Sequence, residues 1–124
     1  MPVHLSPRLV PTLLVRNLAQ TLAFYELLDF RAIGFYPDEQ QPTWVEVQRD
    51  DITLQFHTEA PKGTPPSPIF SGTLYLYPSD VRALAEELRG KVDFAWGPEV
   101  MDYGMRELGI RDPNGYFLAF TEPA

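Results

Sequence analysis

The sequence predicts an α+β fold in which two βαβββ modules form curled mixed sheets, with the helices on the outer side. The prediction rests first on an internal repeat: residues 13–18 and 74–81 are both apolar runs that lead into a helix start. A second pair of similar stretches, 49–52 and 111–115, recurs at nearly the same separation along the chain. Self-similarity at a fixed period indicates that one structural unit occurs twice. The two halves are therefore expected to be copies of one unit.

The first half is predicted to form a strand, a helix and three further strands. Residues 9–15 are rich in β-forming side chains, and Asn17 can cap a helix that has Gln20 at its third position. This helix should end near Asp29, and its apolar face is made by Leu18, Leu22, Tyr25 and Leu28. The strands that follow are expected at 30–36, 43–49 and 52–57.

The second half is predicted to repeat this order. A strand is expected at 70–77, a helix that ends before Gly90, and further strands at 91–96, 104–111 and 116–121. The helix has apolar residues at helical spacing, namely Val81, Leu84, Ala85 and Leu88. Between the halves, residues 59–68 contain four prolines and are predicted to be a linker. We therefore expect one domain over 1–124, made of repeats at about 1–60 and 68–124.

Alternation along a strand predicts which side chains a helix covers and which lie on the other face of the sheet. In the last strand of the first half, the covered side chains are expected to be Ile52, Leu54 and Phe56. The opposite face then carries Thr53, Gln55 and His57. Residues 116–121 alternate in the same way. Two such uncovered faces, set against each other or against a partner chain, would enclose an aromatic-lined cleft.

Composition and charge narrow the function classes. A hydrophobic content of 44% with 13% aromatic residues is typical of a packed globule. The absence of cysteine excludes a disulfide framework, a thiolate nucleophile and a sulfur-based zinc site. A net charge of −7 disfavours a nucleic-acid partner. The start of the chain has no apolar leader and no long apolar run follows, so we expect a cytoplasmic protein without a membrane partner.

Two segments carry a resemblance to a known superfamily. Residues 22–30 (LAFYELLDF) and 103–116 (YGMRELGIRDPNGY) resemble signatures of the vicinal oxygen chelate superfamily. That superfamily includes glyoxalase I, extradiol dioxygenases and the fosfomycin and bleomycin resistance proteins. Asp29 departs from the usual glycine, but aspartate tolerates the left-handed conformation that this position needs. Residues 44–49 and 51–56 are most similar to bleomycin resistance proteins, which are metal-free homodimers that sequester a cationic antibiotic in clefts between subunits.

The resemblance also implies where a metal ion would be held. Metal-using members supply four side chains, usually His and Glu, from the first and last strands of each half. Here those positions fall at Val10 or Pro11, Gln55, Thr73 and Ala119. One amide oxygen is a poor substitute for the three or more good ligands that such sites need. We therefore expect no metal and no cofactor.

The candidate ligand-binding residues are aromatic and acidic side chains together with two polar ones. They are Phe35, Trp44, Glu46, Gln55, His57, Trp96, Tyr103, Met105 and Glu107. The tryptophans could stack on planar rings or simply fill the core. Glu107 could meet a ligand amine or form a structural salt bridge with an arginine. His57 could take part in proton transfer or be an ordinary hydrogen-bonded surface histidine.

Three function hypotheses follow. The first is a metal-free protein that sequesters an aromatic, positively charged small molecule in a cleft that a second subunit completes, with no catalytic residue. The alternative is a metal-dependent lyase, isomerase or dioxygenase with a displaced metal site, built from His57 with Glu46 or Glu107. The third is a small dimeric protein whose cleft has lost its ligand and which acts through protein partners.

Overall fold

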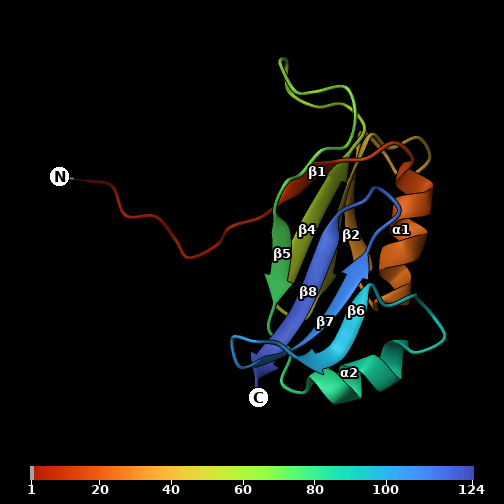
Figure 1. Cartoon of the computed structure of the whole chain (residues 1–124). Coiled ribbons are helices and arrows are strands. Elements are labelled where there is room, and N and C mark those ends of the chain that lie inside the picture. Colours follow the sequence, from red (N-terminus) through yellow and green to blue (C-terminus); the bar gives the residue numbers. More distant parts are fainter. Residues whose placement is uncertain (1) are drawn as a thin grey trace.

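The computed structural model describes residues 2–124, which form two four-stranded sheets and two helices (Figure 1). The first sheet has the order β1-β4-β3-β2, and the second has the order β5-β8-β7-β6. The strands of the first sheet are β1 (Thr12–Leu14), β2 (Arg31–Tyr36), β3 (Trp44–Arg49) and β4 (Ile52–His57). Those of the second are β5 (Thr73–Leu76), β6 (Trp96–Val100), β7 (Met105–Arg111) and β8 (Phe117–Pro123). The helices are α1 (Leu18–Leu27) and α2 (Val81–Leu88).

Both modules have the same topology. The first strand of each module pairs in parallel with the last one, as β1 does with β4 and β5 with β8. All other pairs are antiparallel. The crossover helix of each module packs against the strands of its own sheet. The predicted α+β fold with two βαβββ modules and mixed sheets is therefore confirmed.

The helix ends follow the local chemistry that the sequence predicts. The side chain of Asn17 accepts a hydrogen bond from the backbone N–H of Gln20 at 2.9 Å. Asp80 caps α2 in the same way, accepting from Ala83 at 3.0 Å. These caps satisfy backbone donors that have no partner inside the helix. After α1 the chain reverses at Asp29, whose φ of 62° is the expected left-handed conformation.

The buried apolar side chains of both modules join in one hydrophobic cluster. Leu54 and Phe56 of β4 belong to it, while Gln55 and His57 lie on the opposite, partly exposed face, as alternation predicts. Leu118 and Phe120 of β8 contribute in the same way from the second sheet. Burial of these side chains is the main source of stability, at about 25 cal/mol per Å² of apolar area. Each sheet thus has a core face and a face that no helix covers.

One predicted strand is wrong. The sequence favoured a strand at 91–96, but β6 begins only at Trp96 and ends at Val100. The backbone N–H groups of Lys91 and Val92 both bond back to the carbonyl of Leu88, so the helix end continues into a turn. A backbone engaged in this turn is not free to pair with β7. Strand β1 is also shorter than the predicted 9–15.

Two segments lie outside the regular elements. Residues 58–72 join the modules without a helix or strand, and their assignment as a linker within one domain stays a prediction. Residues 2–11 precede β1 without a helix or strand. The start of this segment extends away from the body of the molecule (Figure 1), whereas its end lies along the first sheet, where the Pro11 carbonyl accepts from the Gln55 backbone N–H. Neither helix within residues 2–124 is long and apolar enough to cross a membrane.

Candidate functional site

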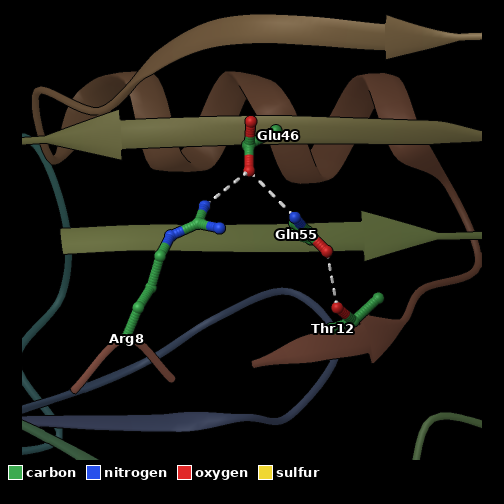
Figure 2. Close-up of polar contacts among 4 residues, drawn as sticks. All are labelled: Arg8, Thr12, Glu46 and Gln55. Carbon is green, nitrogen blue, oxygen red and sulfur yellow. Dashed lines mark hydrogen bonds and ion pairs between the residues drawn. The ribbon is translucent and has the colours of Figure 1, made fainter. Parts of the chain in front are cut away.

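The uncovered face of the first sheet carries a chain of polar contacts that joins strands β1, β4 and β3 and the segment before β1 (Figure 2). The Thr12 hydroxyl on β1 donates to the side-chain oxygen of Gln55 at 2.7 Å. The Gln55 amide in turn donates to a carboxylate oxygen of Glu46 on β3, at 2.8 Å. Arg8, from the segment before β1, approaches the same Glu46 oxygen at 3.4 Å. Glu46 therefore already has a cationic partner within the chain.

Trp44 and His57 lie next to this chain of contacts, directly opposite each other on β3 and β4. Together with Tyr36, Thr43 and Glu59 they line a pocket of about 450 Å³. Phe35 lies elsewhere: it pairs with Val45 and packs against the hydrophobic core. The aromatic residue of β2 that shares the pocket with Trp44 is thus Tyr36, which sequence reasoning did not select.

The uncovered face of the second sheet is built around Trp96. Its indole ring lies over Gly109 on β7, where an added Cβ would come within 2.2 Å of the ring. The ring also contacts Phe117 on β8, with centroids 5.7 Å apart and planes tilted by 40°. Only glycine leaves room for this arrangement. The absence of a side chain at Gly109 therefore allows the Trp96 ring to lie against the sheet.

Glu107 is the buried centre of this second face, with only 1% of its surface exposed. One carboxylate oxygen accepts a hydrogen bond from the Trp96 indole N–H at 3.0 Å. The other accepts from the Tyr103 hydroxyl at 2.6 Å. The bond to Glu107 is the main reason that the pKa of Tyr103 lies above its ordinary value, and Tyr75 contributes to a smaller extent. Opposite Glu107 on β8, the buried hydroxyl of Thr121 has no hydrogen-bond partner.

The structure thus divides the predicted residues between two faces. Trp44, Glu46, Gln55 and His57 share the first face, and Trp96, Tyr103 and Glu107 touch one another on the second. Met105 begins β7, two positions before Glu107, and is partly buried. Within residues 2–124, no hydrogen bond, ion pair or ring contact joins the two groups. The ligand-binding roles of all nine residues stay predictions.

Sequence reasoning missed several side chains on these faces, namely Arg8, Thr12, Tyr36, Tyr75 and Thr121. Alternation could have placed Thr121 opposite Glu107, because β7 and β8 are joined by a short turn and pair as a hairpin. No sequence signal indicates that Arg8, in a segment without a helix or strand, reaches Glu46.

The strand register shows which residues lie beside Gln55 and Ala119, two of the positions at which the resemblance places metal ligands. Gln55 pairs with Thr12 rather than with Val10, and Ala119 pairs with Tyr75 rather than with Thr73. Val10, Thr73 and Ala119 supply no usual ligand. Their neighbours Thr12 and Tyr75 offer only a phenol and a hydroxyl that is already bonded to Gln55. Such donors do not fit a catalytic divalent ion. The described residues also hold no group of three or more His, Cys, Asp or Glu side chains that could bind one elsewhere.

The two-module fold is that of a known superfamily. Residues 4–120 match the family described as the Glyoxalase/Bleomycin resistance protein/Dioxygenase superfamily, and the chain belongs to that superfamily. No curated protein sequence matches the chain.

Solved structures show the same fold at low sequence identity. TnmS3, an antibiotic-binding protein from Streptomyces sp. CB03234, is 22% identical with a TM-score of 0.75, covering 99% of this chain and 100% of its own. A bleomycin-binding protein in complex with bleomycin is 21% identical, with a TM-score of 0.69 and coverage of 96% and 100%. A bleomycin resistance determinant encoded on transposon Tn5 is 23% identical, with a TM-score of 0.66 and coverage of 95% and 98%.

Proposed function

We propose that this chain is a metal-free binding protein that sequesters a planar aromatic, positively charged small molecule. The observation that carries the proposal is the clustering of aromatic rings and carboxylates on the faces that no helix covers. Trp44 lies beside Glu46 on the first face, and Trp96 touches Glu107 on the second. Aromatic faces stack on planar rings and attract cations, and carboxylates complement amines.

The side chains at the expected metal positions support a binding function that uses no metal ion. The positions expected to hold a metal carry Val10 or Pro11, Gln55, Thr73 and Ala119, and the residues that pair with Gln55 and Ala119 are Thr12 and Tyr75. The displaced site of the alternative hypothesis would use His57 with Glu46 or Glu107. Glu46 is already engaged by Gln55 and Arg8, and Glu107 by Trp96 and Tyr103. Metal analysis of protein purified without chelator should find well under one ion per chain. Stoichiometric zinc, iron, manganese or nickel would overturn this part of the proposal.

A second subunit completes the cleft in this proposal. Each uncovered face exposes aromatic side chains, with Tyr36 at 66%, Tyr75 at 47% and Tyr103 at 58% of their surfaces accessible. Exposed aromatic patches of this kind favour contact with another surface. Two copies that set the first face of one against the second face of the other would enclose both tryptophans. Analytical ultracentrifugation should show a dimer, and a monomer at all concentrations would contradict this arrangement.

The binding proposal is tested by titrating the protein with two probes while tryptophan fluorescence is followed: bleomycin, a cationic glycopeptide that carries planar heteroaromatic rings, and 9-aminoacridine, a planar aromatic cation. We expect saturable quenching and a rise in melting temperature, because a ligand that binds only the folded state stabilises it. Trp44→Ala and Trp96→Ala should each weaken binding by about 1–3 kcal/mol if the rings stack on the ligand. Absence of both saturable quenching and thermal stabilisation with both probes would overturn the proposal.

A further inference from the structure

Glu107 is a buried carboxylate without a cationic partner. None of the ion pairs found within residues 2–124 involves it. Its two hydrogen bonds come from neutral donors, Trp96 and Tyr103. Buried carboxylates are costly unless they are paired with a positive charge, and a carboxylate has about four acceptor positions. Glu107 therefore retains both an unmatched charge and unused hydrogen-bonding capacity.

The neighbouring side chains do not balance the negative charge of Glu107. Glu99 on β6 pairs directly with Glu107 in the register, although like charges placed opposite each other destabilise a sheet. Arg106 precedes Glu107 and therefore points to the other face of the strand. Arg111, which shares the face, lies over the ring of Phe117 at 5.6 Å. Thr121 adds a buried hydroxyl with no partner, on the same face as Glu107.

The Tyr103 hydroxyl covers one of the two carboxylate oxygens of Glu107. It lies in the turn between β6 and β7, and 58% of its surface is exposed even though its hydroxyl reaches the buried carboxylate. An exposed side chain on a turn can move aside at little cost in packing. Its departure would uncover one oxygen of Glu107 next to the Trp96 ring.

We propose that Glu107 is the counter-ion for a cationic group of the bound molecule, an amine or guanidinium that replaces the Tyr103 hydroxyl as the donor to Glu107. The Thr121 hydroxyl offers this group a second acceptor, and the Trp96 ring offers a face for the attached aromatic system. The first face lacks this capacity, because Glu46 already has Arg8. This inference rests on the proposed binding function. It adds that one residue, Glu107, is responsible for the preference for a positively charged ligand.

The test compares 9-aminoacridine with acridine, which share a ring system but of which only the first is cationic at neutral pH. Wild-type protein should bind 9-aminoacridine more tightly, and Glu107→Gln should lose ~10- to 100-fold of that preference while retaining acridine binding. Glu26→Gln removes the same charge from an exposed position on helix α1 of the other module and serves as the control. It should keep most of the preference.

Tyr103→Phe provides a second measurement that does not depend on Glu107→Gln being folded. Without the competing hydroxyl, 9-aminoacridine should bind a few-fold more tightly, with acridine unchanged. An unchanged cation preference in Glu107→Gln, or an equal loss of both probes in Tyr103→Phe, would overturn the counter-ion role while the binding function stands. Failure of wild-type protein to bind any of the aromatic probes would overturn both.

Discussion

The hydroxyl of Tyr25, in the helix of the first module, donates a 2.8 Å hydrogen bond to Asp112 in the β7–β8 turn of the second module. Both residues are buried. Asp112 also accepts the backbone N–H groups of Asn114 and Tyr116, at 2.8 and 2.9 Å. The Tyr116 hydroxyl in turn donates to the carbonyl of Leu14 on β1. A turn that sequence reasoning gave no chemical role thus joins the two modules.

Replacing Asp112 by alanine should destabilise the protein by about 1–3 kcal/mol, because three donors, two of them in buried hydrogen bonds, would lose their acceptor. Urea denaturation measures this change. Tyr25→Phe removes only one donor and should cost about 1 kcal/mol, and the double variant should cost less than the sum of the two. Asp102→Ala, at an exposed position in another turn, serves as the control. Equal stability of the two aspartate variants would contradict this account.

The same bond predicts a pH dependence of stability. Burial, and then the neighbouring Asp112, raise the pKa of Tyr25 well above its ordinary value. The protonated phenol is therefore favoured in the folded state. Its contribution is fully present below the unfolded pKa of about 10 and is lost as the pH rises through the higher folded pKa. Denaturation curves of Tyr25→Phe should show a smaller alkaline loss of stability than those of wild type.

Gly109→Ala should displace the Trp96 indole and destabilise the protein by about 1–3 kcal/mol, as overpacking does. Gly34→Ala is the matched control, because a Cβ there would meet Trp44 at an ordinary 3.5 Å. Near-ultraviolet circular dichroism reports the tryptophan environment in each variant. A changed spectrum in the Gly109 variant alone is expected. A larger change in the Gly34 variant would be inconsistent with the described packing.

Glu107→Gln should lower the pKa of Tyr103 toward its ordinary value, because the neutral amide no longer favours the protonated phenol. Ultraviolet absorbance at alkaline pH follows tyrosine ionisation. Tyr103→Phe identifies which step of the titration belongs to Tyr103, by its disappearance. If the tyrosine titrations of wild type and Glu107→Gln coincide, the hydrogen bond between Tyr103 and Glu107 does not persist in solution.

Much of the fold follows from local signals. Asn17 caps its helix as its position predicts, and the alternation of 53–57 assigns each side chain to its face. These features depend on neighbouring residues in the chain, so the sequence carries them directly. Ile52, expected to be covered, is 38% exposed because it lies at the end of β4. Strand β6 was misplaced because its start is decided by the hydrogen bonds that end the preceding helix.

The candidate site was harder to predict, because its contacts join separate strands. The sequence selected Trp96, Tyr103 and Glu107, yet only the register of β6 and β7 shows that all three meet. Phe35 and Tyr36 are neighbours in sequence, and a register shift between Ala32 and Gly34 decides which of them faces Trp44. A local pattern holds no information about such an irregularity in pairing.

The alternation along each strand separates the side chains that build the core from those on the uncovered face of the sheet. On β4, Leu54 and Phe56 belong to the core, whereas Gln55 and His57 do not. Randomising only the outward positions of β3 and β4 should therefore yield libraries in which most members stay folded while their ligand preferences diverge. The same separation would let single substitutions on the uncovered face change ligand preference without loss of the scaffold.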